Sequence, residues 1–180
     1  MFDRLRKHHY KVILTDPPWP FGKGRLEKEK GYPSMTPEQI YALPVESLAL
    51  EDSLLFLWIR ARHLLLALKT ITAWGFEYLT VGLVWIKLGK NGEPFYDIGY
   101  WTRNSAEICL IGKRGSPIRK SANVRQTILS PIREHSRKPE EQYERIQAIS
   151  SGPYLELFAR QTHPGWTVWG DEIHKFDKEI

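Results

Sequence analysis

The sequence has few of the features that would take the protein outside the ordinary globular class. It contains one cysteine, Cys109, so no disulfide framework can form, and a lone thiol in an apolar run is typical of a reducing compartment. No apolar run approaches the roughly 20 residues that a membrane span needs. The N-terminus is charged and lacks the apolar core of a secretory signal. We therefore expect a cytoplasmic protein without a membrane partner.

Common signatures of nucleotide, metal and nucleophile sites are also missing. Gly22 and Gly24 lack the third glycine of a dinucleotide fingerprint and do not follow a strand directly, and there is no P-loop. The six histidines show no ligand-type spacing, so we predict no metal site. No Gly-x-Ser-x-Gly elbow occurs, and Cys109 is expected to be buried. Hydrolysis by a serine or cysteine nucleophile therefore has little support.

Basic and aromatic residues, by contrast, are plentiful. The formal net charge is +5, and there are seven tryptophans and eight tyrosines among 180 residues. Cations beside aromatic faces are what unstacked bases bind, so this composition favours a nucleic-acid partner. The length fits one domain, and we expect residues 1–180 to form it.

Hydrophobic periodicity predicts strands that alternate with helices. Buried or β-rich runs predict strands at Val12–Leu14, Ser53–Ile59, 76–87, 105–112, 126–131, 154–160 and 165–170. Helices are predicted to open at Thr36, to run over residues 62–75 and to begin at Pro139; Thr36 and Gln39 form a capping-box pattern. This alternation predicts an α/β fold with a mainly parallel sheet and helices on both faces. Two long loops, 21–34 and 88–103, interrupt the pattern.

Charged residues stand at the ends of three predicted strands: one past the first strand, one after the run LELF and one after the run TVWG. They are Asp16, Arg160 and Asp171. Because ligands in such sheets bind outside the carboxyl ends of the strands, we expect these residues to lie at one edge.

The tetrad Asp16-Pro17-Pro18-Trp19 has an unusual chemistry for a strand end. The prolines carry no N–H, so their backbone presents carbonyl acceptors only. The Asp16 carboxylate is a further acceptor, and Trp19 offers a stacking face. A planar ring with an exocyclic amino group, such as adenine, suits this combination. Two acceptors that hold both amino protons would direct the nitrogen lone pair at an electrophile.

The tetrad resembles the DPPW motif of adenine-N6 methyltransferases of the MT-A family. The blocks WTRNSAEICLIGKRG, SRKPEEQYERI, YLELFAR and GWTVWGDE also resemble family blocks, in the family's order. The resemblance implies a Rossmann-like methyltransferase fold with permuted motif order, S-adenosylmethionine as cofactor and adenine N6 as methyl acceptor.

The resemblance also implies roles for individual residues. Asp16 and the Pro17 carbonyl would hold the target amino group, with Pro18 and Trp19 beside the base, and Asp16 would also touch the cofactor. Lys138 would meet the methionine carboxylate, as expected at a helix N-terminus. The remaining cofactor positions are Glu156, Arg160, Asp171 and Glu172. Asp171-Glu172 replaces the Asn-Gln of the eukaryotic enzyme. The chain begins 15 residues before Asp16, so we expect the upstream segment that contacts the cofactor's adenine in longer members to be curtailed or absent.

Basic residues in the loops are candidates for nucleic-acid contacts, because phosphate binding by such residues supplies affinity. They are Lys23, Arg25, Lys28, Lys30, Arg103, Asn104, Arg114, Arg119 and Lys120. A base within a duplex would have to be flipped out to reach the tetrad.

The leading hypothesis is S-adenosylmethionine-dependent methylation of adenine N6 in DNA by a bacterial or phage enzyme. The same reaction on RNA is the first alternative. A catalytically silent nucleic-acid-binding partner is the second, although that interpretation predicts a decayed tetrad. A small-molecule methyltransferase is the least favoured. A homodimer or a related subunit is a possible partner.

Overall fold

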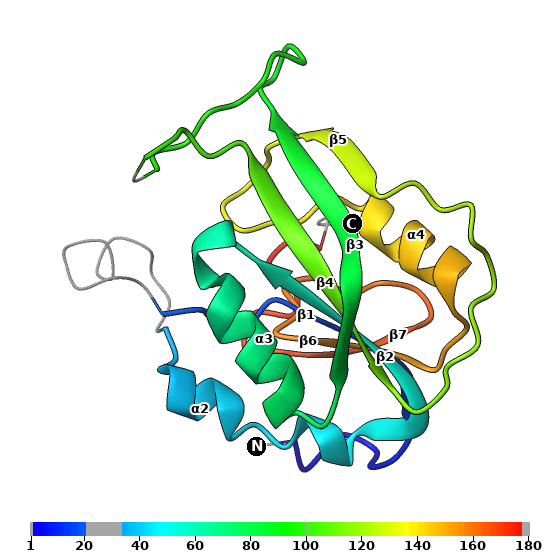
Figure 1. Ribbon diagram of the computed structural model, residues 1–180. Helices are drawn as coiled ribbons and strands as arrows, with labels where there is room; N and C mark the ends of the chain where they lie inside the picture. The colour runs from blue at the N-terminus through cyan, green and yellow to red at the C-terminus, as the bar shows by residue number, and fades with distance from the viewer. Residues whose placement is uncertain (1, 21–33, 100, 178–180) are drawn as a thin grey trace.

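The computed structural model describes residues 2–20, 34–99 and 101–177. One sheet has the strand order β5-β3-β4-β2-β1-β6-β7 (Figure 1). Its strands are β1 (Tyr10–Thr15), β2 (Ala49–Ile59), β3 (Glu77–Leu88), β4 (Ala106–Arg114), β5 (Thr127–Pro131), β6 (Tyr154–Leu157) and β7 (Trp166–Trp169). The helices are α2 (Pro37–Tyr41), α3 (Leu64–Ala73) and α4 (Glu141–Ile149), with short 3₁₀ turns η1 (Val45–Ser47) and η2 (Ala61–His63). None of these helices is long and apolar enough to cross a membrane.

The sheet is mainly parallel, as predicted. The pairs β1–β2, β1–β6, β6–β7 and β3–β5 are parallel, and only β4 runs opposite to its neighbours β2 and β3. Between β3 and β4 the chain has a long loop instead of the helix that a parallel crossover would need. The sequence pattern had not indicated this reversal.

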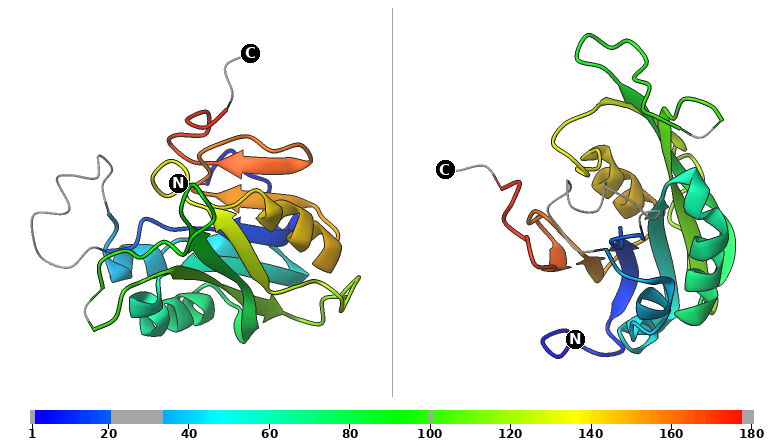
Figure 2. Two further views of the ribbon diagram at one scale, coloured as in Figure 1. Left: turned by 90° about the horizontal axis from the view of Figure 1, so that it is seen from above. Right: turned by 90° about the vertical axis from the view of Figure 1, so that its left-hand side faces the viewer.

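The two faces of the sheet are covered by different helices, because successive residues of a strand point to opposite sides. Ile13 of β1 packs in the cluster that contains Ile40 of α2 and Ile71 of α3. Its neighbours Val12 and Leu14 pack in the cluster that contains Tyr143 and Ile146 of α4. Figure 2 shows α3 and α4 on the two sides of the sheet. The predicted α/β fold with helices on both faces is therefore confirmed.

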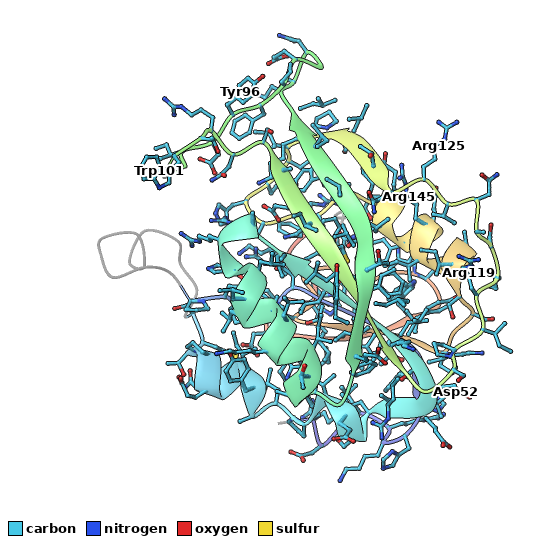
Figure 3. All side chains as sticks on the ribbon, in the orientation of Figure 1. Asp52, Tyr96, Trp101, Arg119, Arg125 and Arg145 are labelled. Carbon is cyan, nitrogen blue, oxygen red and sulfur yellow. The ribbon has the colours of Figure 1, made fainter. Side chains whose placement is uncertain are left out.

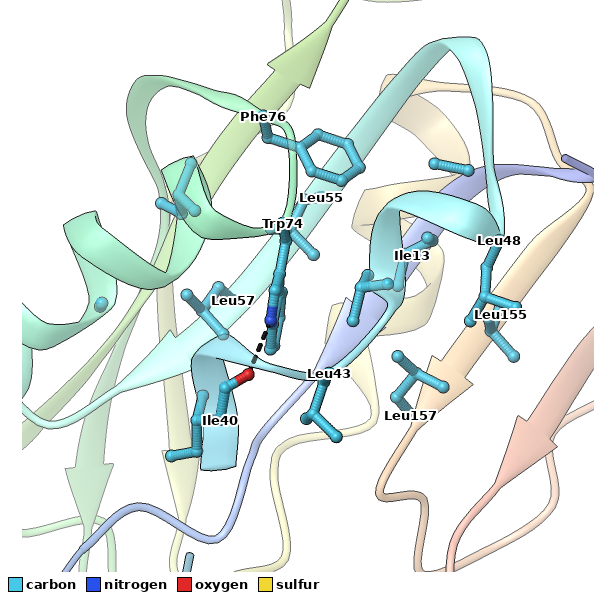
Figure 4. Close-up of a cluster of buried hydrophobic side chains, with 14 of the residues drawn as sticks. Ile13, Ile40, Leu43, Leu48, Leu55, Leu57, Trp74, Phe76, Leu155 and Leu157 are labelled. Atoms are coloured by element: carbon cyan, nitrogen blue, oxygen red, sulfur yellow. Dashed lines mark hydrogen bonds between the residues drawn. The ribbon is translucent and has the colours of Figure 1, made fainter. Parts of the chain in front are cut away.

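Trp74 joins α3 to α2 within the first cluster (Figure 4). Its side chain is fully buried, and its indole N–H donates to the Ile40 carbonyl at 2.8 Å. The helix α2 begins with the predicted capping box: Gln39 N–H donates to Thr36 Oγ1 at 3.3 Å, and Thr36 N–H donates to Gln39 Oε1 at 2.8 Å. These contacts hold α2 beside the edge of the sheet where the site lies.

Four strands end together at this edge. Thr15 of β1 pairs with Leu57 of β2 and with Leu157 of β6, and Leu157 pairs with Trp169 of β7. Residues that follow these positions are therefore brought together although they are far apart in the sequence.

Candidate active site

A pocket of about 790 Å³ lies where β1, β2, β6 and β7 end. This volume is within the range of small-molecule sites. One part of the lining, which we call the β1–β2 side, consists of Pro17, Pro18, Trp19, Arg60 and His63. Another part, the β6–β7 side, consists of Phe158, Arg160, Asp171, Glu172 and Phe176. Asp16, Glu107, Lys138, Tyr143 and Glu156 complete the arrangement.

The tetrad enters this pocket from β1. Asp16 follows the last residue of the strand, and its side chain is one-third exposed. The Pro17 carbonyl accepts from Trp19 N–H at 2.7 Å, and the Pro18 carbonyl accepts from Met35 N–H at 2.8 Å. A carbonyl oxygen has two lone pairs, so each can still accept a second hydrogen bond from a ligand.

Trp19 forms a wall of the pocket more than an open platform. Its side chain is 7% exposed, and its indole N–H donates to the Trp58 carbonyl at 2.9 Å. One neighbour is the His63 ring, which is stacked at 5.7 Å between centroids. A ligand in the pocket therefore meets only a small part of the indole.

His63 braces the end of the tetrad. Its Nε2 lies 3.1 Å from the Pro20 carbonyl, and its Nδ1 is buried without a hydrogen-bond partner among the described residues. Burial, together with the Arg62 charge, lowers the pKa of His63 to about 4. The ring is therefore neutral at physiological pH.

Buried groups of alternating charge extend from Asp16 into the sheet. Lys138 Nζ lies 2.5 Å from Asp16 Oδ2 and 3.0 Å from Glu107 Oε2. Lys87 Nζ contacts the other Glu107 oxygen at 2.6 Å. Burial opposes ionisation of Glu107, but the two lysines outweigh it and lower its pKa to about 2. Burial also opposes the charge of Lys138, yet Asp16 and Glu107 raise the pKa of its ammonium group, so it stays cationic.

The pKa of Asp16 is shifted in the opposite direction from that of Glu107. Burial raises the pKa of Asp16, and the Lys138 charge only partly offsets this effect. Asp16 has one lysine beside it, whereas Glu107 has two. The Asp16 carboxylate is therefore the more basic of the two, as suits a group that accepts hydrogen bonds from a ligand.

Glu156 points into the same pocket from β6. It pairs in register with Leu14 of β1, and its Oε2 accepts from the Tyr143 hydroxyl at 2.8 Å. Burial, reinforced by the Asp16 charge, raises the pKa of Glu156 to about 8, although the Tyr143 hydrogen bond acts in the opposite direction. Glu156 thus holds a proton at neutral pH.

Arg160 and Glu172 pair across the β6–β7 side. Arg160 Nε and Nη2 donate to Glu172 Oε2 at 2.8 and 2.6 Å, and Nη1 donates to the His135 carbonyl at 3.1 Å. Asp171 lines the pocket beside them and is exposed. The structure therefore brings Asp16, Arg160 and Asp171 to one edge, where the sequence predicted them.

The basic residues proposed for nucleic-acid contacts are dispersed. Arg103 is exposed in the β3–β4 loop, which leaves the sheet at the pocket edge. Asn104 braces this loop, because its Nδ2 donates to the Ile98 carbonyl at 3.1 Å and its backbone pairs with Asp97. Lys23, Arg25, Lys28 and Lys30 lie outside the described residues.

Arg114 lies at the opposite edge of the sheet. Because β4 is reversed, its last residue pairs with Ser53 near the start of β2, and Arg114 contacts Glu46 at 3.2 Å. Lys120 caps the far end of α4, donating from Nζ to the Gln147 carbonyl at 2.9 Å. Arg119 is exposed in the same segment (Figure 3). The structure does not bring these three residues to the pocket.

Sequence inspection missed several residues of the pocket. Glu107 is a lone charge within an apolar strand, and such a residue is almost never buried unless paired, which is a usable signal. Its partner Lys87 could not be identified without the pairing of β3 with β4. Phe176 carries no sequence signal. Among the described residues, no cluster of three or more His, Cys, Asp or Glu side chains could hold a metal ion.

The strand order, the covered sheet and the pocket at the strand ends together define a Rossmann-like methyltransferase fold. Comparison with known proteins identifies the family. The MT-A70 family model matches residues 10–172. The chain therefore belongs to the MT-A70 family.

Three relatives show how far the similarity extends. The type II methyltransferase M.MunI of a Mycoplasma species is 31% identical over 200 residues, covering 96% of this chain and 82% of that protein. A putative N(6)-adenosine-methyltransferase MT-A70-like protein of Medicago truncatula is 33% identical over 90% of this chain. The human N(6)-adenosine-methyltransferase catalytic subunit METTL3 is 28% identical over 95% of this chain. The chain spans only 26% and 30% of the plant and human proteins.

Proposed function

We propose that this protein transfers a methyl group from S-adenosylmethionine to the 6-amino group of adenine in DNA. The observation that carries the proposal is the position of Asp16 and Pro17. A carboxylate and a rigid carbonyl acceptor stand side by side at the end of β1, within a pocket of about 790 Å³.

These acceptors fit an adenine amino group. Its two N–H bonds would donate to the Asp16 carboxylate and to the free lone pair of the Pro17 carbonyl. This pair of hydrogen bonds draws the nitrogen toward a pyramidal geometry and directs its lone pair away from the ring plane. Formation of the new carbon–nitrogen bond requires loss of one N–H proton, and Asp16 is the acceptor positioned to receive it.

The residues present also fit S-adenosylmethionine, which supplies an electrophilic methyl group when it is bound. Lys138, next to the N-terminus of α4, would hold the methionine carboxylate. Asp171 would accept hydrogen bonds from the ribose hydroxyls. Glu156, on β6, would be a further side chain in contact with the cofactor. Lys138 already contacts Asp16 and Glu107, so its cation is fixed in place before any ligand arrives.

Support for DNA as substrate comes from the similarity to M.MunI, which extends over 82% of that protein. The alternative is RNA. A relative from Cryphonectria parasitica named N6-methyladenosine RNA methyltransferase MTA1 is 32% identical over 94% of this chain, which covers 53% of that protein. A catalytically silent partner is less favoured, because the Asp16–Lys138 contact is present.

Incubation with labelled S-adenosylmethionine and four substrates, single- and double-stranded DNA and RNA, tests the proposal. We expect label in N6-methyladenine of DNA. Asp16→Asn, which keeps the shape of the side chain and removes its charge, should reduce the rate at least about 100-fold, as expected for loss of a group that positions and accepts a proton.

The matched control is Asp52→Asn. Asp52 is exposed near the opposite edge of the sheet (Figure 3), so its loss should leave the rate unchanged. If label appears only in RNA, the substrate is RNA and not DNA. Label that persists in Asp16→Asn would refute the role of Asp16.

A further inference from the structure

The segment after β7 contributes side chains to the pocket wall. We call Asp171–Asp177 the C-terminal strap. Phe176 N–H donates to the Arg160 carbonyl at 3.0 Å, and Asp177 Oδ1 accepts from Thr162 N–H at 2.8 Å. Together with the Arg160–Glu172 ion pair, these bonds fix the strap at both of its ends. The family match stops at residue 172, so Phe176 lies beyond the part of the chain that the family describes.

The strap places one aromatic ring in the pocket wall. Phe176 is half-buried and lines the pocket. The guanidinium carbons of Arg137 and Arg160 lie 5.1 and 5.2 Å from its ring centroid, within the range of cation–π contacts. Both arginines are themselves pocket residues. The ring thus holds two planar cations and presents an apolar surface beside them.

A planar nitrogen heterocycle is the chemistry that matches such a wall. Aromatic rings and guanidinium planes both stack on bases, because every base has a π face. The neighbouring Asp171 is an acceptor for hydroxyl groups. A nucleoside could therefore stack its base on this wall and donate hydrogen bonds from its ribose hydroxyls to the Asp171 carboxylate.

The position of the wall indicates which nucleoside it would bind. Phe176, Arg160 and Asp171 belong to the β6–β7 side, whereas Pro17 and Trp19 belong to the β1–β2 side. In the proposed reaction the target adenine reaches Pro17. The β6–β7 side is then left for the nucleoside half of the cofactor.

We infer that Phe176 of the C-terminal strap binds the nucleoside half of S-adenosylmethionine, as a wall residue contributed from outside the family-matched segment. The inference rests on the proposed function for its cofactor. It makes the strap part of the binding site.

Calorimetric titration with S-adenosylhomocysteine tests the inference without measuring catalysis. We expect Phe176→Ala to weaken binding about tenfold, as expected for loss of one stacking ring. Phe176→Tyr keeps the ring and should bind within about twofold of the unaltered protein. Phe176→Leu keeps apolar bulk without a π face and should weaken binding by about as much as Phe176→Ala. 5′-Methylthioadenosine, which lacks the amino-acid part, should show the same loss in Phe176→Ala.

Tyr78→Ala is the matched control, because Tyr78 is an aromatic residue that is 42% exposed, lies at the start of β3 and is outside the pocket lining. It should leave the affinity unchanged. If Phe176→Ala and the unaltered protein bind with equal affinity, the inference is overturned while the proposed function stands. A loss for S-adenosylhomocysteine that is absent for methylthioadenosine would also overturn it. If the unaltered protein binds no S-adenosylhomocysteine, the proposed function fails, and the inference fails with it.

Discussion

Two glutamates of the pocket differ in charge because their neighbours differ. Glu107 contacts Lys87 and Lys138, and it is ionised despite burial. Glu156 contacts a neutral hydroxyl, that of Tyr143, and burial leaves it protonated up to a pKa of about 8. The same side chain is thus a fixed anion in one place and a titratable acid in the other.

The raised pKa of Glu156 predicts a specific dependence of stability on pH. An unfolded glutamate ionises near pH 4.5, whereas folded Glu156 keeps its proton up to about pH 8. Between these values the folded state binds more protons, so the free energy of unfolding decreases as the pH rises. Glu156→Gln removes this contribution. We therefore expect the variant to gain stability relative to the unaltered protein, by up to ~1.4 kcal/mol for each pH unit between the two values.

Urea denaturation at pH 5, 6.5 and 8 measures this difference. Glu144→Gln, on the exposed surface of α4, is the control and should give a curve parallel to that of the unaltered protein. A stability difference between Glu156→Gln and the unaltered protein that stays constant from pH 5 to pH 8 would show that the folded carboxyl is ionised over this range.

At the scale of elements, Gly170 controls the approach of β7 to the end of β6. A Cβ atom at this position would lie 2.5 Å from the Ala159 carbonyl oxygen and 2.9 Å from its nitrogen. Both are backbone atoms that cannot move aside easily. We expect Gly170→Ala to lower the free energy of unfolding by about 1–3 kcal/mol and to weaken cofactor binding, because Asp171 and Glu172 follow directly.

Denaturation combined with S-adenosylhomocysteine titration tests Gly170→Ala. Gly165→Ala is the comparison, since Gly165 has φ +81° but nothing within 4 Å of an added Cβ. It should lose about 1 kcal/mol from left-handed backbone strain and keep its affinity for the ligand. Full affinity in Gly170→Ala would mean that the two carboxylates do not depend on this close approach.

The elements also show how far the sequence could predict the structure. Local signals were sufficient for the capping box at Thr36, for the strands, and for the placement of Asp16 and Arg160 at one edge. The first two predictions depended on residues close together in the chain, and the third on the rule that ligand sites in such sheets lie outside the carboxyl ends of the strands. The Lys87–Glu107 pair depends on the register between β3 and β4, which no local pattern contains.

The direction of β4 explains the other difference between sequence and structure. The basic run after this strand was a candidate for nucleic-acid contacts, and such contacts would require it to lie near the pocket. The reversal of β4 places Arg114 at the opposite edge. Strand direction is a property of the whole sheet, and hydrophobic periodicity is the same for both directions.

At the scale of the whole molecule, the β3–β4 loop carries the two most exposed tyrosine or tryptophan side chains among the described residues. It leaves the sheet at the pocket edge and projects from it, with Tyr96 and Trp101 on its surface (Figure 3). Their exposed fractions are 61% and 99%, and Arg103, two residues after Trp101 in the sequence, is also exposed. A tryptophan next to an arginine can stack on a base while the cation contacts a phosphate. We therefore expect the loop to contact nucleic acid that enters the pocket.

We expect Trp101→Ala to weaken binding of single-stranded DNA about tenfold at constant salt, because one stacking contact is lost. Arg103→Ala should instead reduce the dependence of affinity on salt, by roughly one phosphate contact in the slope. Fluorescence anisotropy over a range of salt concentrations measures both effects. The control is Tyr78→Ala, since Tyr78 is 42% exposed and lies at the start of β3, at the opposite edge of the sheet. If Trp101→Ala and Tyr78→Ala bind DNA equally well, the substrate approaches the pocket by another surface. A loss confined to Trp101→Ala, with unchanged affinity for S-adenosylhomocysteine, would separate the nucleic-acid surface from the cofactor site.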